Sequence, residues 1–508
     1  MTDDPESNVT RGANIKKEQE QLKLINKTIF LHALACHTLG WFEISGALEK
    51  VLPPPTIHDR FEVDQGIEIG KKARELFPKG KPVMDFNSPK AVRTTEELMN
   101  DSKVTSIFEA TFISQGFVTR ADILERVENS WHLIEVKSSI NDKIDFIPDM
   151  AFTYAIASLS GVKISKISLM LVSRDFRLGM DNSKLFVLID KTKEIMKFRE
   201  SLPLEEIRKQ LNSQTGPAPV AKLICSKCPM FRECVGKNIE NHVLDVPRLS
   251  DIKLSQLISL NITSIENIPE EFPLTEIQSN VRKCVIKKGP VIDEDLGIKL
   301  ASIVFPVYYL DFESVNLALP PYSDIAPYTM LPTQYSIHEC SAVGQVTEHR
   351  EFLADPSKDS RRDLAENLIR DLGQAGSVVT YSSFEKTVIS GLGLLFPDLK
   401  ASLDRLLARL VDLSAIVGKN IFHPDFHGKY SLKVVLPILV PTLTYRDLKI
   451  QNGGDAIAMF AWMIKKKLYG KQIDETRNNL CKYCERDTLA MVRLHEKLAE
   501  LAADLNLK

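Results

Sequence analysis

Two carboxylates and a lysine in the first third of the chain have the types and spacing of a metal-dependent hydrolytic site. Asp122 lies in the segment TRADIL, and Glu135 and Lys137 lie in LIEVKSS. Alternate side chains of a strand point to the same face, so Glu135 and Lys137 share a face from which Val136 is excluded. Carboxylates hold hard divalent ions such as Mg²⁺, and a lysine can stabilise a phosphate or the attacking water. With Asp122 on a neighbouring strand, we expect the three to converge.

Four of the eight cysteines form a second group that could do chemistry. Cys36 lies far upstream of a close-set trio in CSKCPMFREC, which is Cys225, Cys228 and Cys234. Eight unevenly spaced cysteines among 508 residues, without a secretion signal, indicate thiols or ligands and no disulfide framework. Zinc is one expected occupant, because the trio and His242 could form a local tetrahedral site without Cys36.

The order of these motifs resembles the PD-(D/E)XK nuclease superfamily. Asp122 is followed by Glu135-x-Lys137, a helical stretch and the apolar run ISLMLVS at 167–173. With one cysteine before the core and C-x2-C-x5-C after it, the chain is similar to the RecB-like branch that carries an iron–sulfur cluster. That resemblance implies a restriction-endonuclease-like core and a structural cluster, 4Fe–4S in kind, on the four cysteines. Thiolate-only ligation suits such a cluster, with Zn²⁺ as the alternative.

Two positions depart from that family. The family's histidine in a helix before the core falls near Gly70, which follows Gly66, with Glu68 as a substitute. The family's glutamine after the lysine falls where FTYAI offers Thr153 and Tyr154. These departures favour an alternative in which the site is degenerate.

A second set of chemically capable residues lies in the C-terminal part. The run SIVFPVYYLDFES places Asp311 and Glu313 two apart at the end of an expected strand, on one face. Glu385 lies where a strand runs into a helix in VVTYSSFEKTVISGL. Tyr483 and Asp487 are four apart in an expected helix and therefore project to one side. Four carboxylates and a tyrosine are thus available to one site.

This second set resembles the RNase H-like 3′–5′ exonucleases of the DnaQ type whose third motif is Y-x3-D. The resemblance implies that Asp311, Glu313 and Asp487 bind two metal ions and that Tyr483 orients the attacking water. Ser382 and Glu385 stand where the family has Asn and Asp. The segments DFES, PTQYSIHE, YSSFE, HPDFHGKYSLKVVLP and YCERDTLAM also resemble a bacterial domain of unknown function that is fused behind RecB-like nucleases.

Three further patterns have structural interpretations. Cys481 and Cys484 form a second C-x2-C on the helix that carries Tyr483, and we expect them to pack in the core. His423 and His427 flank Asp425, and we expect hydrogen bonding there more than metal ligation. The basic cluster KKKLYGK, residues 465–471, is expected to be a solvated helix end.

Composition sets the outer limits. An apolar content of 44% and a charged content of 26% are typical of a globular chain, and 508 residues are enough for two or three domains. The net charge of −2 gives no global attraction to nucleic acid, so any phosphate binding must be local. No apolar run reaches the length of a membrane span, and the N-terminus is unlike a secretory signal. We therefore expect a cytoplasmic protein.

The predicted organisation is α/β. It comprises a disordered tail at 1–25, a restriction-endonuclease-like nuclease domain with the cysteine site at 26–236, and a helical connector at 237–300. The helix–turn–helix pattern around Asn261 and Ile262 indicates either a helix-hairpin-helix-like unit that clasps a phosphate backbone or plain linker packing. An RNase H-like mixed sheet with flanking helices follows at 301–508.

The predicted function is a nuclease that hydrolyses DNA phosphodiesters with Mg²⁺ or Mn²⁺, in repair or in defence against foreign DNA. Single strands or free DNA ends are the expected partner, and RNA stays open. The alternative is a degenerate protein that binds nucleic acid or acts as a scaffold.

Overall fold

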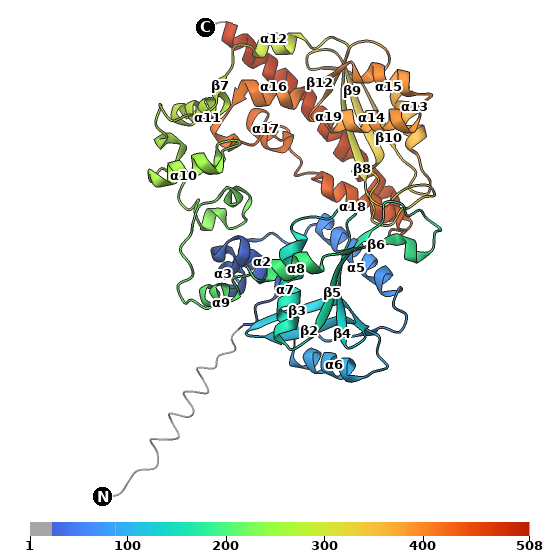
Figure 1. Cartoon of the computed structure of the whole chain (residues 1–508). Coiled ribbons are helices and arrows are strands. Elements are labelled where there is room, and N and C mark those ends of the chain that lie inside the picture. The colour runs from blue at the N-terminus through green and yellow to red at the C-terminus, as the bar shows by residue number, and fades with distance from the viewer. Residues whose placement is uncertain (1–22, 87, 507–508) are drawn as a thin grey trace, which may run out of the picture. The chain divides into compact units, whose positions relative to one another are not determined.

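The computed structural model describes residues 23–86 and 88–506 and divides the chain into two compact α/β units (Figure 1). The first unit runs up to Pro54 and continues over Asp64–Val220. The second contains Pro55–Val63 and the described residues from Ala221 onward. The predicted boundary at residue 236 therefore lies 16 residues beyond the division at Val220, and the cysteine trio falls in the second unit.

A six-stranded sheet with the order β1-β2-β3-β4-β5-β6 forms the centre of the first unit. Neighbours β2–β3–β4 and β5–β6 are antiparallel, whereas β1–β2 and β4–β5 are parallel. The parallel step from β4 to β5 is made by α7 (Phe146–Leu159), which has the residues expected of a helix there. The strands are β1 (Lys81–Pro82), β2 (Ser106–Ser114), β3 (Phe117–Val127), β4 (Ser130–Lys137), β5 (Ile164–Val172) and β6 (Phe186–Asp190).

Packing against α7 fixes the start of α2 (Lys27–Ala35) in the first unit. The rings of Phe30 on α2 and Phe152 on α7 are stacked with centroids 4.4 Å apart. Ile25 is buried and pairs with Phe117, so the expected tail ends before it; residues 1–22 lie outside the described part. The other helices are α3 (His37–Ser45), α4 (Ala47–Val51), α6 (Pro89–Asn100), α8 (Thr192–Arg199) and α9 (Leu204–Leu211), with the 3₁₀ helix η1 (Asn182–Leu185). Helix α5 (Ile57–Arg74) begins in the second unit and continues in the first from Asp64.

The part of the chain that follows the first sheet in sequence and precedes the second is built mainly from short helices. Asn261 has a positive φ of 58° and ends the turn after α10 (Asp251–Ser259), but one 3₁₀ turn follows it and α11 begins only at Glu276. The helix–turn–helix expected around Asn261 therefore has a single 3₁₀ turn as its second element. The elements here are η2 (Leu223–Lys227), η3 (Phe231–Glu233), η4 (Val243–Asp245), η5 (Ile265–Asn267), α11 (Glu276–Lys287), β7 (Val291–Ile292) and α12 (Leu296–Ala301).

A five-stranded mixed sheet with the order β10-β9-β8-β11-β12 forms the centre of the second unit. Strands β8–β9–β10 are antiparallel, and β8–β11–β12 are parallel. The strands are β8 (Val307–Val315), β9 (Leu331–Ala342), β10 (Gln345–Leu353), β11 (Ser377–Thr380), β12 (Leu410–Asp412) and the short β13 (Ile421–Phe422), which pairs with β7. The helices are α13 (Arg361–Asp371), α14 (Phe384–Leu395), α15 (Lys400–Leu407), α16 (Leu413–Asn420), η6 (Pro424–Phe426), α17 (Leu432–Leu439), α18 (Gly453–Ile464) and α19 (Lys471–Asn506).

Alternation along β8 decides which side chains face α19. Val307 and Tyr309 belong to the core that includes Met491 and Leu494 of α19, whereas the even-numbered Tyr308, Leu310 and Phe312 pack with α13 and α14. Since strand side chains alternate, Asp311 and Glu313 lie on the face that α19 covers.

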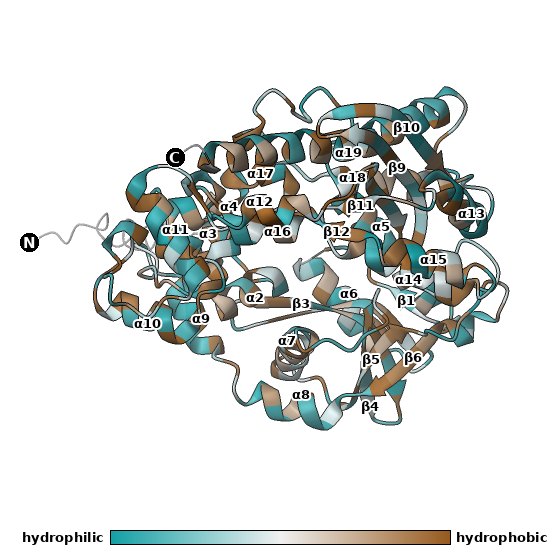
Figure 2. Cartoon of the chain, turned by 90° about the horizontal axis from the view of Figure 1, so that it is seen from above, coloured by the Kyte–Doolittle hydropathy of each residue, from teal (hydrophilic) through white to brown (hydrophobic). Residues whose placement is uncertain are grey.

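Hydropathy differs between the strands and the outer helices. Figure 2 shows brown, hydrophobic colour along β5 and β6, while the outer helices such as α10 mix teal and brown. Within residues 23–86 and 88–506, no helix combines the length and apolar character that crossing a bilayer requires.

Candidate functional site

Three carboxylates of the second unit meet between β8 and α19. Asp311 and Glu313 come from β8 and Asp487 from α19, and one oxygen of each lies within 4.8 Å of the others. Asp487 is buried, whereas Asp311 and Glu313 are partly exposed. The strand spacing of two and the helix position of Asp487 thus bring three of the predicted ligands to one accessible place.

Burial and mutual repulsion make it costly for all three carboxylates of this cluster to be ionised. Burial, followed by the charge of Asp487, raises the pKa of Asp311 well above its usual value, and the same two causes act on the pKa of Glu313. Burial also raises the pKa of Asp487. A bound cation would remove this cost, and an oxygen-only donor set is the kind that Mg²⁺ and Mn²⁺ prefer. The residues present therefore fit a hard divalent ion.

Two residues that the sequence did not single out orient this cluster. Lys433 of α17 donates a hydrogen bond of 2.7 Å from Nζ to the phenol oxygen of Tyr483. Tyr445, between α17 and α18, donates a hydrogen bond of 2.5 Å to Oδ1 of Asp487. Lys433 lies in the segment HPDFHGKYSLKVVLP, whose resemblance to a domain of unknown function gives this lysine no role, and Tyr445 had no sequence signal. Together they fix Tyr483 and Asp487 on adjacent positions of the site.

The predicted Glu385 lies beside the cluster and not in it. It occupies the first turn of α14, is 3% exposed and accepts a hydrogen bond of 2.9 Å from the hydroxyl of Ser382. Burial raises its pKa to about 7, and its charge contributes to the raised pKa of Asp311. Among the described residues, the carboxylate group whose oxygens lie within 4.8 Å of one another consists of Asp311, Glu313 and Asp487, without Glu385.

The second C-x2-C of the chain packs against the cluster. Cys484 is fully buried and its thiol lies 3.5 Å from Oδ2 of Asp311, as a donor to that oxygen. Burial, followed by the charge of Asp311, raises the pKa of the Cys484 thiol. The thiol therefore stays protonated next to the carboxylates, in agreement with the packing interpretation.

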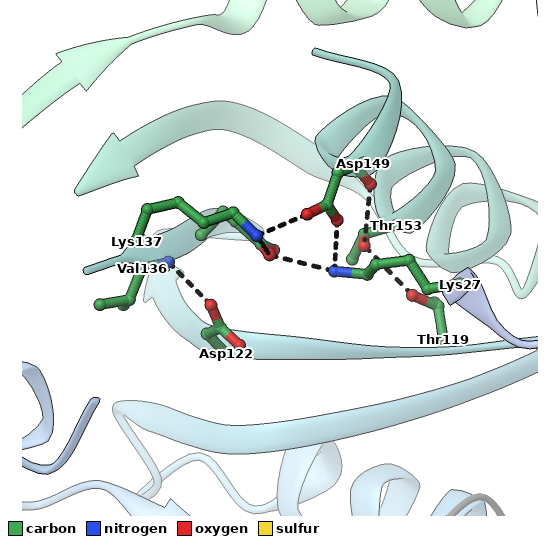
Figure 3. Close-up of polar contacts among 8 residues, drawn as sticks. Lys27, Thr119, Asp122, Val136, Lys137, Asp149 and Thr153 are labelled. Atoms are coloured by element: carbon green, nitrogen blue, oxygen red, sulfur yellow. Dashed lines mark hydrogen bonds and ion pairs between the residues drawn. The ribbon is translucent and has the colours of Figure 1, made fainter. Parts of the chain in front are cut away.

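A second polar cluster lies in the first unit (Figure 3). Nζ of Lys137 is 2.9 Å from Oε1 of Glu135, which places the two on one face of β4 as the strand alternation predicted. Nζ of Lys27, from α2, lies 3.0 Å from the same oxygen and 2.7 Å from Oδ1 of Asp149, and Asp149 also pairs with Lys137. Asp122, on the neighbouring strand β3, accepts a 2.7 Å hydrogen bond from the backbone N–H of Val136.

This cluster contains its own cations. Against the effect of burial, Glu135 and Asp149 raise the pKa of both Lys27 and Lys137, and the two ammonium groups lower the pKa of Asp149. Burial, followed by the charge of Glu135, raises the pKa of Asp122 to about 7. Oε2 of Glu135 is buried without a hydrogen-bond partner. Asp122 and that oxygen are the groups that fit a metal ion here.

A pocket of about 260 Å³ opens beside Asp122. Gly66 and Gly70 of α5 lie one helical turn apart along its wall, next to Lys71 and Arg74, and a Cβ at either glycine would meet open space. Gly70 therefore leaves room where the resembled family has a histidine. Glu68, the expected substitute, is not among the lining residues.

The expected glutamine position is occupied by a structural hydroxyl. Thr153 of α7 is buried, accepts a 3.1 Å hydrogen bond from Thr119 of β3 and donates to the backbone oxygen of Asp149. Thr153 thereby holds α7 against the sheet. The side chain of α7 that reaches Lys137 is Asp149, four residues earlier.

The four predicted cysteine ligands are divided between the units. Cys36 belongs to the first unit, whereas the trio lies on the short 3₁₀ turns of the second. The backbone N–H of Lys222 lies 3.4 Å from Sγ of Cys225, within the cap of η2. The four-cysteine set stays a prediction.

The zinc alternative and the histidine pair near residue 425 have other arrangements. Of the described residues, those that gather three or more potential ligand atoms within 4.8 Å include no cysteine. Nδ1 of His242 accepts a hydrogen bond from the N–H of Leu244. His423 accepts one from the N–H of Asp425, and His427 lies 3.2 Å from Asp245. These histidines form hydrogen bonds, as expected for His423 and His427.

Comparisons with known proteins place a family model on the sheet of the second unit. A model described as a domain of unknown function, DUF2779, matches residues 308–431. An uncharacterized protein of Mycoplasma pneumoniae is 24% identical over 209 residues, which are 37% of this chain and 31% of that protein. An uncharacterized protein of Ureaplasma parvum is 23% identical over 236 residues, 42% of this chain and 34% of that protein. The chain thus spans about a third of the length of the curated relatives it matches.

Proposed function

We propose that the protein is a metal-dependent nuclease whose second unit contains a 3′–5′ exonuclease-type site. The convergence of Asp311, Glu313 and Asp487 on one accessible place supports this most directly. An acidic, oxygen-only site would repel a phosphodiester unless cations were bound, and with them it becomes a phosphate site. The resemblance of the D-x-E and Y-x3-D motifs to RNase H-like exonucleases favours nucleic acid as the phosphodiester.

The residues of the chain have separable roles in this proposal. Asp311, Glu313 and Asp487 hold divalent metal, which when bound lowers the pKa of water and stabilises the departing oxygen. Tyr483 orients the attacking water through its phenol, and Lys433 fixes that phenol by the 2.7 Å hydrogen bond. Against the effect of burial, which raises the pKa of Asp487, the hydrogen bond from Tyr445 favours the ionised form of that carboxylate.

Glu385 has a weaker role than the resemblance implied. Its carboxyl group is held by Ser382 and lies outside the 4.8 Å cluster. Its charge nevertheless acts on Asp311, whose pKa it helps to raise after burial, Asp487 and Glu313. We therefore assign it to the site as an acidic neighbour that strengthens cation binding.

The first unit adds a second nuclease-like site to the proposal. Asp122 and Glu135 would hold metal and Lys137 would stabilise the phosphate, as the D…E-x-K order implies. Lys27 and Asp149 extend this set, and the pocket beside Asp122 gives access to it. Because two ammonium groups already neutralise most of the charge here, we expect weaker metal binding than in the second unit.

The deciding experiment uses end-labelled single- and double-stranded DNA with Mg²⁺, Mn²⁺ or EDTA. The full chain should shorten 3′ ends with metal and stop in EDTA. Residual 3′ shortening should persist in Lys137→Ala, which silences the first site, and disappear when Asp311→Asn is added. Cleavage that needs no metal would overturn the mechanism for both sites.

The competing proposal is a binding protein with two degenerate sites. The internal cations Lys27 and Lys137 favour it for the first unit. If this proposal is right, the protein should bind DNA without cleaving it, whichever metal is added. The Asp311→Asn chain should bind DNA equally well. A parallel set of RNA strands tests the other open substrate.

A further inference from the structure

Two histidines and a glutamate form a second potential ligand group in the second unit. His338 of β9 and His349 of β10 are direct cross-strand partners, so their side chains lie on one face of the sheet. Their ring centroids are 4.6 Å apart. Glu485 of α19 covers this face, and one potential ligand atom from each of the three residues lies within 4.8 Å of the others.

Hydroxyl groups behind the histidines orient both rings. Nδ1 of His338 lies 2.8 Å from Oγ1 of Thr488, which lies 2.8 Å from Oγ of Ser336, and that oxygen lies 2.9 Å from Nε2 of His349. The chain ends on the backbone oxygen of Glu485, to which Thr488 donates at 3.0 Å. The two rings are therefore connected by one continuous hydrogen-bond chain.

The direction of this chain follows from its end. A backbone carbonyl only accepts, so Thr488 is the donor in its contact with Glu485, and when its single hydroxyl proton is placed there Thr488 accepts from Ser336 and His338. Ser336 then accepts from His349. Each ring thus donates from the nitrogen that the chain engages, which leaves the lone pairs on Nε2 of His338 and Nδ1 of His349.

This is the tautomer that a metal ion requires. Metal-binding histidines donate the N–H of the second nitrogen to an outer partner, which fixes the ring and its basicity. Glu485 supplies an accessible carboxylate beside the two imidazoles.

The group is separate from the carboxylate cluster. Glu485 lies two positions from Tyr483 and from Asp487 on α19, and residues two apart on a helix do not face each other. The two groups share no ligand, and their chemistry differs, because imidazole nitrogen selects transition metals whereas oxygen sets select Mg²⁺ or Mn²⁺.

We propose that His338, His349 and Glu485 bind a Zn²⁺ ion that links the β9–β10 hairpin to α19. Three protein ligands of the two-histidine, one-carboxylate type leave a fourth position for water, a common arrangement for zinc. Zinc–ligand bonds of about 2.0–2.2 Å require the three ligand atoms to lie closer together than 4.8 Å. The accessible side chain of Glu485 would move toward the histidines to bring them closer. The ion would hold the β9–β10 hairpin, whose strand β9 pairs with β8, in register with α19, which carries Asp487.

The test measures zinc bound to the full chain by elemental analysis after dialysis against buffered Zn²⁺. His349→Ala and Glu485→Gln, at accessible positions that tolerate change, should each bind one equivalent less than the unaltered chain. The matched controls are Glu348→Gln, next to His349 on the opposite face of β10, and His423→Ala, a histidine elsewhere in the unit. Both should keep the full content. Asp311→Asn should also keep it, which separates this ion from one in the carboxylate cluster.

The outer hydrogen bonds give a second readout. Thr488→Val removes the acceptor for His338 and should weaken zinc affinity about 10–100-fold, whereas Thr488→Ser keeps the hydroxyl and should restore it. Co²⁺ in place of Zn²⁺ should give visible absorption that His349→Ala abolishes. Unchanged zinc content and affinity in both His349→Ala and Glu485→Gln would overturn the proposal, whatever the nuclease assay shows.

Discussion

Lys433 donates a 2.7 Å hydrogen bond to the phenol oxygen of Tyr483, although 50 residues of chain separate them. The same ammonium group lies 4.7 Å from the centre of the Tyr483 ring and 5.2 Å from that of Tyr445. A single lysine therefore faces both tyrosines of the carboxylate cluster and reduces the repulsion there, since its charge lowers the pKa of Glu313 against the effect of burial and of Asp487.

Removing the phenol of Tyr483 should slow 3′ shortening less than removing a metal ligand. Tyr483→Phe loses one orienting group, for which a cost of about 10²–10³ in rate is typical, whereas Asp311→Asn should abolish metal-dependent shortening. Single-turnover rates on 5′-labelled single strands measure both, in the Lys137→Ala chain. The exposed Tyr469→Phe is the matched control and should keep the full rate. Equal losses in Tyr483→Phe and Asp311→Asn would assign Tyr483 a role in metal binding.

Removing the hydroxyl of Tyr445 should weaken the metal site without abolishing the reaction. Tyr445→Phe takes away the 2.5 Å hydrogen bond to Asp487, and the loss of such an outer partner typically costs about 10–100-fold in metal affinity. The Mn²⁺ concentration for half-maximal rate should rise by that factor, with the rate at saturating Mn²⁺ nearly kept. Tyr381→Phe, whose hydroxyl bonds the backbone oxygen of Tyr430, is the control. A loss of rate that Mn²⁺ does not restore would contradict this role.

Local sequence patterns predicted the features of the fold and the site that follow from strand and helix periodicity. The spacing of two in Asp311 and Glu313, and of four in Tyr483 and Asp487, is repeated in β8 and α19, and α7 has the predicted residues. Tyr445 and Lys27 could not be found in this way. Each reaches its carboxylate across a long stretch of chain, 42 residues for Tyr445 and 108 for Lys27, and only tertiary packing brings them there.

The remaining differences have the same origin. Asp149 is one of several acidic residues near the start of α7, and its selection follows from the helix phase that turns it toward Lys137. His338 and His349 become partners only through the register of β9 and β10, which the sequence did not specify. Glu385 had the expected helix but sits outside the cluster, where its carboxylate accepts a hydrogen bond from Ser382.

The stability of metal-free protein should fall between about pH 4.5 and 7. The pKa of Glu385 rises from 4.5 to about 7 on folding, so its contribution to stability is complete below pH 4.5 and is lost as the pH rises through 7. This shift corresponds to about 3 kcal/mol. Glu385→Gln should therefore be more stable than the unaltered chain at pH 8, in EDTA, and lose that advantage at pH 4.5. Urea unfolding at the two pH values measures it.

The exposed Glu366→Gln is the control for this pH effect and should leave the difference between the two pH values unchanged. Mn²⁺ at pH 8 should stabilise the unaltered chain, since cation binding removes the repulsion in the cluster. A Glu385→Gln chain with the same pH profile as the unaltered one would show that Glu385 is ionised in the folded state at the ordinary pH.

The cysteine prediction is tested by anaerobic purification. If Cys36 and the trio hold an iron–sulfur cluster, the protein should be brown and contain iron and sulfide, and Cys36→Ala should lose both as completely as Cys228→Ala. Cys340→Ala, a buried cysteine of the second sheet, is the control and should keep the colour. Colourless protein would rule out the cluster, and an unchanged Cys36→Ala would remove that residue from the ligand set.

Lys27 should act as an internal cation that competes with metal in the first unit. Its ammonium lies 3.0 Å from Glu135 and 2.7 Å from Asp149, so Lys27→Met leaves two buried carboxylates with Lys137 as their remaining close cation. Breaking a buried pair from one side costs about 3–5 kcal/mol, and we expect the lower end because a quarter of the Lys27 side chain is exposed. Thermal unfolding in EDTA measures this loss, with the exposed Lys50→Met as control.

Mn²⁺ should then stabilise Lys27→Met more than the unaltered chain, because Glu135 and Asp149 become available to the ion. Equal stabilisation of both chains would mean that Lys27 does not occupy the place of a metal, and that the cluster of the first unit is held together by its own lysines alone.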